Sequence, residues 1–312
     1  MKKSDLSSMK NKPLIGCVIV TFNRLNKLKH ALHCYATQTQ KPAYILVVNN
    51  CSVDGTKEYL DNWLLDDVGI TQSEFGFPTT KHELNYLNGN LELVDRGVIT
   101  KTRLSGWMRG IEEDVYLSFQ NVPRLKNINL SVSTSDQMIK GKFGGKKTRD
   151  DIIKSTIKAL DAAVACGAQS IGVNAEDASR SDIEYLITFG IEAKKHGAQK
   201  FRYCDTLGYD DPISAYERIT KIASETKMDI ELHFHNDLGM AAGNSVIGAK
   251  AAIDAGVNAY INTAVNGMGE RAGNADLISC LLGVLKSSGM HDKYLIDPNI
   301  NLSKTSKLAK YT

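Results

Sequence analysis

The sequence has no strong charge bias and no long apolar run. Its 38 Lys and Arg residues nearly balance 35 Asp and Glu residues, which leaves a formal net charge of +3. So small an excess does not favour binding to nucleic acid or to a charged membrane surface. No stretch approaches the roughly 20 apolar residues that a membrane-spanning helix needs. We therefore expect neither a nucleic-acid partner nor a membrane partner.

The sequence also lacks paired cysteines. Its six cysteines lie at positions 17, 34, 51, 166, 204 and 280, and none forms a C-x-x-C motif. This spacing indicates neither a zinc finger nor a disulfide framework. Reduced thiols are typical of the cytoplasm, which is the location we expect. The basic start and the apolar run 14–20 imitate a signal peptide, but no small-residue cleavage site follows, so we predict a buried strand there.

The chain is otherwise rich in alternating strand-like and helical patterns. With 312 residues, 42% of them hydrophobic, it is long enough for one large barrel or two smaller domains. The first part predicts buried strands over 14–22 and 43–50, and helices over 25–35 and 56–65. This order indicates a βαβα unit with parallel strands.

The rhythm continues through the rest of the chain. Strand-like runs recur at 70–77, 102–107, 127–132, 170–175, 201–205, 229–235 and 259–265. Helical patterns separate the later runs, at 149–166, 181–196, 244–255 and 275–286. Another helix is predicted to begin with Asp211 as its N-cap and Pro212 at its first helical position. Seven strands of this kind predict a (β/α)₈ barrel that lacks one strand of its own.

The stretch 231–237 combines this strand pattern with two histidines. Because alternate residues of a strand point the same way, Glu231, His233 and His235 share one face. Leu232 and Phe234 share the opposite face and are expected to pack beneath helices. Two neighbouring imidazoles can bind a divalent metal. The alternative is a pair of hydrogen-bonded polar residues at a strand end.

The N-terminal part resembles family 2 glycosyltransferases over about residues 13–67. The matching residues are 18–24 (VIVTFNR) and 45–56 (ILVVNNCSVDGT). In that family these loops hold the nucleotide of a sugar donor. The family usually has Asp where Asn49 stands, and no later D-x-D motif is present to bind the metal and diphosphate. The resemblance therefore implies a truncated segment, which we assign to residues 1–67.

The remainder carries six motifs in order, each at or just after the end of a predicted strand. They are 74–78 (EFGFP), 103–109 (RLSGWMR), 175–180 (AEDASR), 202–208 (RYCDTLG), 233–239 (HFHNDLG) and 266–274 (NGMGERAGN). Barrel enzymes keep their chemistry at these strand ends. Over about residues 64–312 the chain resembles the homocitrate synthase and 2-isopropylmalate synthase family of DRE-TIM metallolyases. We assign this barrel to residues 68–312.

The resemblance implies a metal-dependent Claisen condensation of acetyl-CoA with a 2-oxo acid. A divalent metal chelated by the acid polarises its keto carbonyl. Mixed nitrogen and oxygen ligands suit Mg, Mn or Zn, so the metal is left open. The implied partners are small molecules, with acetyl-CoA as co-substrate. A homodimer is compatible with the sequence, which does not fix the oligomeric state.

The resemblance also implies roles for individual residues. His233 and His235 are the expected metal ligands, and Asn274 adds its side-chain oxygen; the alternative for Asn274 is the N-cap of the last helix. Glu176 matches the catalytic glutamate that deprotonates or orders the acetyl methyl group. Its alternative is a salt bridge at the barrel mouth.

Three further residues are implied substrate contacts. Thr206 matches the hydroxyl that binds the 2-oxo acid carboxylate, with a helix cap as the alternative. Arg109 and Arg180 are candidate carboxylate partners because a guanidinium binds both oxygens, and surface ion pairs are the alternative. The basic, glycine-rich loop 140–149 is either a contact for the phosphates of CoA or a solvated loop.

One segment of the metallolyase family has no counterpart. The family begins with a strand ending in D-T-T-L-R-D-G-E-Q, whose Asp binds the metal and whose Arg stabilises the enolate. The nearest residues are 52–55 (SVDG), so we expect Asp54 near the two histidines and Val53 in place of the Arg. Loss of one such donor costs on the order of 10²–10³ in rate.

These observations together predict a chimera. The expected fold is α/β, a (β/α)₈ TIM-type barrel whose first strand is replaced by the glycosyltransferase-like βαβα segment. The expected function is an acyltransferase of the homocitrate or 2-isopropylmalate synthase type with impaired turnover. The alternatives are a family 2 glycosyltransferase-like protein and a catalytically inactive chimera that still binds metal.

Overall fold

Seven parallel strands form one curled sheet in the computed structural model, which describes residues 16–21, 25–37, 44–49, 62, 64–79, 81–290, 294 and 297–311. The strands follow the chain order β3-β4-β5-β6-β7-β8-β9. Their bounds are β3 Gln72–Phe75, β4 Arg103–Arg109, β5 Asn127–Ser133, β6 Ser170–Glu176, β7 Lys200–Asp205, β8 Asp229–Phe234 and β9 Ala259–Asn262. The arrangement is of the TIM type, which confirms the predicted fold class.

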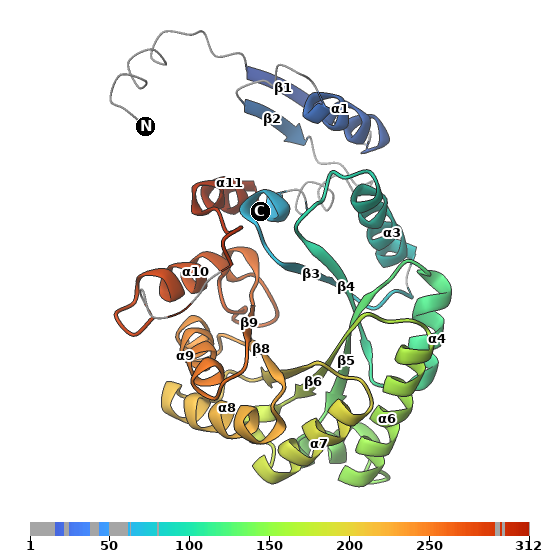
Figure 1. Cartoon of the computed structure of the whole chain (residues 1–312), viewed down its shortest axis with the longest axis vertical. Helices are drawn as coiled ribbons and strands as arrows, with labels where there is room; N and C mark the ends of the chain where they lie inside the picture. Colours follow the sequence, from blue (N-terminus) through green and yellow to red (C-terminus); the bar gives the residue numbers. More distant parts are fainter. Residues whose placement is uncertain are drawn as a thin grey trace.

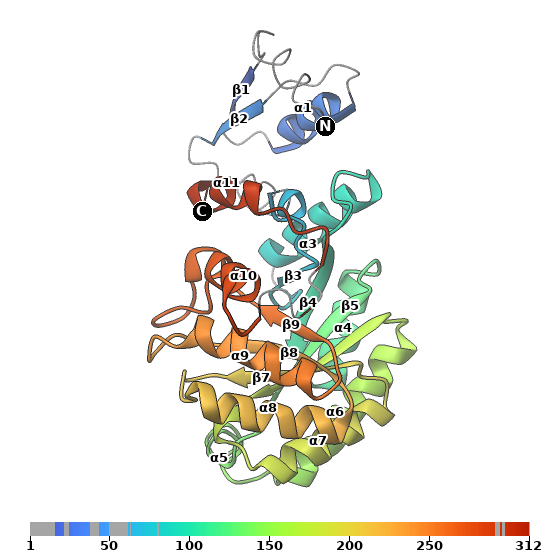
Figure 2. The same ribbon diagram turned by 60° about the vertical axis from the view of Figure 1, so that its left-hand side comes forward.

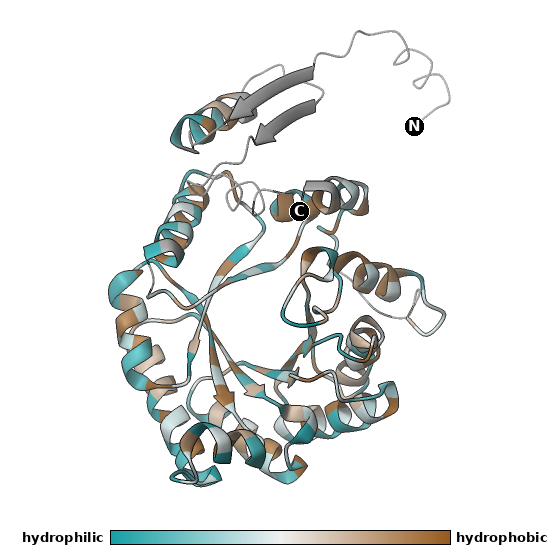
Figure 3. Cartoon of the chain, turned by 180° about the vertical axis from the view of Figure 1, so that it is seen from behind, coloured by the Kyte–Doolittle hydropathy of each residue, from teal (hydrophilic) through white to brown (hydrophobic). Residues whose placement is uncertain are grey.

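Helices lie around the outside of the curled sheet (Figure 1). They are α3 Lys81–Asp95, α4 Glu112–Asn121, α5 Asp136–Phe143, α6 Arg149–Ala165, α7 Ile183–Lys195, α8 Pro212–Thr226, α9 Ala241–Asp254, α10 Leu277–Lys286 and α11 Thr305–Tyr311, with short 3₁₀ turns η1 Ala178–Arg180, η2 Val265–Gly267 and η3 Leu302–Lys304. Brown and teal bands alternate along these helices (Figure 3). Such amphipathic helices bury one side on the sheet and expose the other.

The helix starts follow local sequence signals. Thr148 caps α6 in a capping box with Asp151, and Asp182 caps α7 by accepting from the Tyr185 N–H. Asp211 caps α8, with Pro212 at the first helical position, as the sequence predicted. These caps fix where each strand-to-helix loop ends at the mouth of the barrel.

The N-terminal segment does not supply the first barrel strand, so this part of the prediction is wrong. β1 (Gly16–Thr21) pairs in parallel with β2 (Tyr44–Asn49) along its whole length, and α1 (Leu25–Thr37) connects them. The two strands form a separate sheet that has no hydrogen bonds to β3–β9 (Figures 1 and 2). The physical reason is local: a strand, a crossover helix and a parallel strand close on each other before more distant edges are reached.

Residues 64–68 are helical and pack against side chains of α10 and α11. Val68 is buried in a small cluster with Leu277 of α10 and Leu308 of α11. Asp66 accepts hydrogen bonds from the backbone N–H groups of Thr100, Lys101 and Thr102, which lie just before β4. The division into 1–67 and 68–312 stays a prediction. None of the described helices is long and apolar enough to cross a membrane.

A buried ion triad crosses the interior of the curled sheet. Arg202 on β7 donates to both oxygens of Glu74 on β3, each at 2.6 Å, and to Oε1 of Glu231 on β8 at 2.7 Å. Although burial alone would raise the pKa of Glu231, the charge of Arg202 lowers it below its ordinary value. β3 and β7 are not neighbours in the sheet. The triad therefore holds the sheet curled across its open interior.

This triad leads to a stability prediction. Arg202→Met leaves two carboxylates buried without their cation, so we expect the free energy of unfolding to fall by about 3–5 kcal/mol. Arg96→Met is the control, because Arg96 forms only an exposed pair with Glu92 at 3.6 Å and should change stability by less than about 0.5 kcal/mol. Urea unfolding of both variants measures the difference, and equal stabilities would contradict the role of the triad.

Candidate functional site

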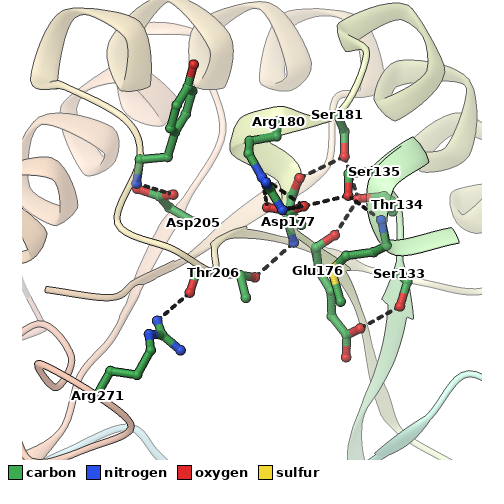
Figure 4. Close-up of polar contacts among 12 residues, drawn as sticks. Ser133, Thr134, Ser135, Glu176, Asp177, Arg180, Ser181, Asp205, Thr206 and Arg271 are labelled. Atoms are coloured by element: carbon green, nitrogen blue, oxygen red, sulfur yellow. Dashed lines mark hydrogen bonds and ion pairs between the residues drawn. The ribbon is translucent and has the colours of Figure 1, made fainter. Parts of the chain in front are cut away.

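The polar residues named from the sequence gather at the carboxyl ends of β6, β7 and β8. Glu176 ends β6, Thr206 follows β7, and His233 and His235 lie at the end of β8. Because all strands of the sheet are parallel, their carboxyl ends open on the same side. Figure 4 shows Thr206 bonded to the backbone of Asp177, the residue after Glu176, and the carboxylate of Glu176 bonded to Ser133. The sequence thus located the face of the barrel that carries the candidate site.

The two histidines face each other. Nε2 of His233 lies 3.1 Å from Nε2 of His235, and their rings are nearly perpendicular at 84°. Nδ1 of His233 lies 2.8 Å from Oδ1 of Asn262 at the end of β9. An amide oxygen only accepts, so His233 carries its proton on Nδ1 and presents the lone pair of Nε2. Leu232 and Phe234 are fully buried on the opposite face, as predicted.

Both imidazoles are neutral at pH 7. Burial, reinforced by the charge of Arg202, lowers the pKa of His233 to about 4. Burial also lowers the pKa of His235. Neutral imidazoles are the form that binds metals. Without a metal, His235 would instead donate its Nε2 proton to the Nε2 lone pair of His233.

The geometry of the pair fits a divalent metal. Two nitrogens at roughly 2.1 Å from one ion lie about 3.1 Å apart when their angle at the ion is near 95°. This matches the observed Nε2–Nε2 distance of 3.1 Å. In the described part of the chain, no group of three or more His, Cys, Asp or Glu residues is arranged so that it could hold a metal ion. Among the described residues, the histidines are therefore a two-nitrogen pair without a third His, Cys, Asp or Glu ligand.

Asn274 lies beside the pair, and its role as an additional metal ligand stays a prediction. It forms an isolated antiparallel bridge with His235, and its buried Nδ2 has no hydrogen-bond partner among the described residues. Its Oδ1 lies only 1.9 Å from where a Cβ on Gly269 would stand, so glycine is required there. The alternative role as helix cap is wrong, because Asp276 caps α10.

Asp54, the fourth predicted ligand, lies outside the described residues, as does Val53. Their expected positions beside His233 and His235 stay predictions. The separate sheet formed by β1 and β2 removes the structural premise for them, since β2 does not occupy a barrel position.

Glu176 is held by both carboxylate oxygens. Oε1 accepts from Oγ of Ser131 at 2.6 Å, and Oε2 accepts from Oγ of Ser133 at 2.8 Å. Nζ of Lys142 lies 3.4 Å from Oε2 and 3.1 Å from the Ser133 hydroxyl. The arrangement orients Glu176 and includes the predicted salt bridge, here with Lys142.

Thr206 belongs to a tight turn shared with β6. Its Oγ1 accepts from the backbone N–H of Asp177 at 2.9 Å, which leaves the hydroxyl proton to donate (Figure 4). The helix-cap alternative is wrong, because Asp211 caps α8. Asp177 is fully buried, has a positive φ of 63° and binds Arg180. This local strain fixes the loop that follows Glu176.

The two arginines predicted as substrate contacts are both in ion pairs. Arg109 binds Asp114 through Nε at 2.6 Å and Nη2 at 2.9 Å, and Arg180 binds Asp177 through Nη2 at 2.6 Å. These pairs are the alternative that the sequence left open. Contact with a substrate carboxylate stays a prediction for both residues.

Several residues at the mouth were not assigned a role from the sequence. Arg271 donates to both oxygens of Asp237, at 2.8 and 2.9 Å, and to the carbonyl of Thr206 at 2.6 Å. It thereby ties the loops after β7, β8 and β9 together. Ser131 and Ser133 stand two residues apart on β5, and this S-x-S spacing is the signal that could have identified them. The predicted loop 140–149 is shorter in the structure, because Lys142 lies on α5 and reaches Glu176, whereas Arg149 begins α6 and pairs with Asp136.

Comparison with known proteins identifies the family. The profile of the HMGL-like family matches residues 49–311. The chain belongs to the HMGL-like family. This confirms the resemblance to the homocitrate and 2-isopropylmalate synthases. A second profile, glycosyl transferase family 2, matches residues 17–74 only, which is a partial match at the N-terminus.

Curated relatives are similar in sequence over about four fifths of the chain. The chain is 56% identical over 252 residues to citrate (Re)-synthase of Dehalococcoides mccartyi, covering 81% of this chain and 61% of the relative. It is 34% identical over 248 residues to 2-isopropylmalate synthase 2 of Caldanaerobacter subterraneus, covering 80% of this chain and 59% of the relative. The chain thus spans about three fifths of the length of these relatives.

Solved structures of HMGL-like proteins share the fold. Hydroxymethylglutaryl-CoA lyase of Pseudomonas aeruginosa aligns with a TM-score of 0.63 at 13% identity, covering 96% of this chain and 91% of that chain. HMG-CoA lyase of Brucella melitensis aligns with a TM-score of 0.61 at 14% identity, covering 83% and 90%. At these identities the likeness concerns the fold alone.

Hydrogen bonds to two carboxylates, those of Asp205 and Asp210, hold the loop that follows β7. Asp205 accepts from the backbone N–H groups of Tyr209 and Asp210, and Asp210 accepts from the Tyr203 hydroxyl at 2.6 Å. The Tyr203 oxygen in turn accepts from Nε of Arg218. Burial raises the pKa of Asp210 to about 6. The loop is therefore held in part by Asp210, whose pKa in the folded protein lies above its ordinary value.

This pKa gives a pH prediction. Because the folded pKa is raised, the stabilisation from Asp210 is complete below its unfolded pKa, near 3.8, and is lost as pH rises through about 6. Asp210→Asn keeps the acceptor for Tyr203 but does not titrate. We expect the unfolding free energy of the variant, relative to wild type, to increase between pH 4 and pH 7 by on the order of 2 kcal/mol. Urea unfolding at several pH values measures this, and a constant difference would contradict it.

Proposed function

We propose that the chain is the barrel part of an acetyl-CoA-dependent condensing synthase that joins an acetyl unit to a 2-oxo acid. The observation that carries this proposal is the pair His233 and His235, whose Nε2 atoms lie 3.1 Å apart at the barrel mouth. Membership of the HMGL-like family supports it, as do relatives named as citrate, homocitrate and 2-isopropylmalate synthases. Each of those products contains an acetyl unit added to the keto carbon of a 2-oxo acid.

In the proposed reaction, His233, His235 and Asn274 hold a divalent metal. When bound, that metal supplies Lewis-acid polarisation of the keto oxygen. The Nδ1–H of His233 donates to Asn262, which fixes the ring and its free lone pair. Arg271 keeps the loops around the pair in place through Asp237 and the carbonyl of Thr206.

Glu176 is the proposed base for the acetyl methyl group. Its carboxylate is oriented by hydrogen bonds from Ser131 and Ser133, and it forms an ion pair with Nζ of Lys142 at 3.4 Å. Glu176 takes a methyl proton, and the resulting carbon nucleophile forms a C–C bond with the keto carbon while the carbonyl π bond breaks and the keto oxygen takes up a proton to become the 2-hydroxyl. Hydrolysis of the thioester then releases the free thiol of CoA. Thr206 still has a hydroxyl proton to donate to the carboxylate of the 2-oxo acid.

We propose that turnover is impaired. Among the described residues no strand lies between β9 and β3, the place that remains to close the barrel. From the sequence, the predicted counterpart of the enolate-stabilising arginine of the resembled family is Val53, an apolar side chain that donates no hydrogen bond and lies outside the described residues. Loss of one such donor lowers the rate by roughly 10²–10³. The chain would then bind metal and substrates more readily than it condenses them.

Activity is the first prediction of this proposal. We expect slow release of CoA thiol from acetyl-CoA when a divalent metal and a 2-oxo acid are both present, followed with a disulfide dye. Oxaloacetate, whose acetyl adduct is citrate, is the first acid to test because of the 56% identity to citrate (Re)-synthase. Glu176→Gln should lower the rate at least about 10²-fold.

The matched control is Glu184→Gln, since Glu184 is exposed on α7 and pairs only with Lys221 on the surface. Its rate should equal that of wild type. Hydrolysis of a nucleotide sugar without thiol release would instead favour the function suggested by the partial glycosyl transferase match. Thiol release that is independent of metal would contradict the proposed mechanism.

Metal affinity is the second prediction. Calorimetric titration with Mn²⁺ or Zn²⁺ should show one site, which His233→Ala and His235→Ala abolish. Asn262→Ala should weaken binding by about 10–100-fold, because it removes the acceptor that orients His233. His196→Ala is the control, because His196 follows α7 and contacts Asp161 of α6, not His233 or His235. Unchanged binding in both site variants would refute the metal site while leaving the fold intact.

A further inference from the structure

Lys142 places an ammonium group beside Glu176, the proposed base. Its Nζ lies 3.4 Å from Oε2 of Glu176 and donates to the Ser133 hydroxyl at 3.1 Å. These partners stand at the carboxyl ends of β6 and β5, where the candidate site opens. Because an ammonium has three N–H donors and no acceptor, one donor remains for a third partner. The geometry therefore provides a cation with a spare hydrogen bond next to the base.

The helix that carries Lys142 is fixed to the loop after Glu176. Ser135 caps the start of α5, and its hydroxyl donates to Asp177, the residue that follows Glu176 (Figure 4). α5 ends at Gly144, which has a φ of 58° and the left-handed C-cap conformation that favours glycine. The backbone of Lys142 thus has a set position relative to the base. Its side chain is 46% exposed and keeps room to adjust.

The other cations at the mouth are paired with carboxylates that keep their charge. Arg109, Arg180 and Arg271 each bind an aspartate through two nitrogens. These aspartates take no part in the proposed proton transfer, so the three guanidinium groups stay paired throughout. Lys142 differs from them because its carboxylate partner is Glu176 itself.

Proton transfer to Glu176 changes the charge that Lys142 faces. When the methyl C–H bond of the acetyl group breaks, the proton moves to Glu176 and neutralises its carboxylate. The electron pair of that bond forms the C=C bond of an enolate, and the carbonyl π pair moves onto the thioester oxygen. One negative charge therefore disappears 3.4 Å from Nζ while another develops on an oxygen nearby. A donor already in place at that oxygen lowers the barrel enzyme's activation barrier.

The distances allow Lys142 to reach this oxygen. Reacting atoms in a productive complex lie about 3–3.5 Å apart, which sets the distance from the Glu176 oxygen to the methyl carbon. With bonds of about 1.5 and 1.2 Å, the thioester oxygen lies about 2.4 Å from that carbon. Nζ is also 3.4 Å from Oε2 of Glu176. An acetyl group can therefore give its methyl proton to the base while its oxygen accepts a hydrogen bond from Nζ.

We propose that Lys142 is a catalytic residue whose ammonium donates a hydrogen bond to the thioester oxygen as the enolate forms. This inference rests on the proposed function and adds a residue to its mechanism. It gives the chain a donor for the enolate although the predicted counterpart of the family's arginine is Val53. A flexible ammonium lacks the rigid fork of a guanidinium, so this replacement is compatible with slow turnover.

The first test compares lysine variants in the full chain. Lys142→Met removes the ammonium, Lys142→Arg keeps a cation, and Lys158→Met removes an equal charge from an exposed position of α6. Thiol release is followed with acetyl-CoA, oxaloacetate and Mn²⁺. We expect Lys142→Met to lower kcat about 10²-fold or more, Lys142→Arg to lower it less, and Lys158→Met to change it less than about twofold.

The second test needs no turnover and separates direct contact from an effect through Glu176. Carboxymethyl-CoA, a thioether, carries a carboxylate where the enolate oxygen would form. Its affinity and that of CoA are measured by calorimetry in Glu176→Gln, which imitates the protonated base, with and without Lys142→Met. We expect the added substitution to weaken carboxymethyl-CoA about tenfold or more and CoA less than about twofold. A lysine that only orients Glu176 has no carboxylate to act on in this background.

Three results would overturn this inference alone. They are a wild-type kcat in Lys142→Met, equal losses in Lys142→Met and Lys158→Met, and equal affinity for carboxymethyl-CoA with and without Lys142→Met in the Glu176→Gln protein. Metal-dependent thiol release by the wild-type chain would leave the proposed function standing in each case. Absence of that release from the wild-type chain would overturn the proposed function and this inference together.

Discussion

The pairing of Arg202 with Glu74 and Glu231 is the constraint on which the rest of the structure depends. A parallel sheet that is open between β9 and β3 has no ladder to hold its first strand near its last ones. Arg202 does this through the interior, because its guanidinium reaches β3 and β8 at once with distances of 2.6–2.7 Å. Buried charges cost free energy unless they are paired, so the three side chains are compatible with burial only when the sheet is curled.

The same curvature brings the candidate site together. Glu231 and His233 lie on one face of β8, so the residue that binds Arg202 is two positions before the residue that faces His235. Below the mouth, the interior of the curled sheet contains the ion pairs of Arg202 with Glu74 and Glu231. At the mouth it carries the imidazole pair and, on β6, the carboxylate of Glu176 held by two serine hydroxyls. A cavity lined by residues of β3 and β9 lies where the sheet is open.

Much of this was predictable from the sequence because it rests on local patterns. Alternation along 229–235 predicted which side chains face inward, and the caps at Asp211 and Pro212 predicted the start of α8. The pairing of β1 with β2 was not foreseen as a separate sheet, since strand period does not say which edge a strand meets. The contacts of Arg271 and Lys142 were also missed. They join loops or elements far apart in sequence, and exposed-looking basic residues carry no signal of their partner.

The central claim is that His233 and His235 converge on one metal at the mouth of an HMGL-like barrel. The most direct measurement is anomalous X-ray diffraction from crystals of the full chain grown with Zn²⁺, recorded on both sides of the zinc absorption edge. The account predicts one strong anomalous peak within bonding distance of both Nε2 atoms, with the side-chain oxygen of Asn274 next to it. A peak at any other position, or imidazoles that only bond to each other in the presence of Zn²⁺, would contradict it.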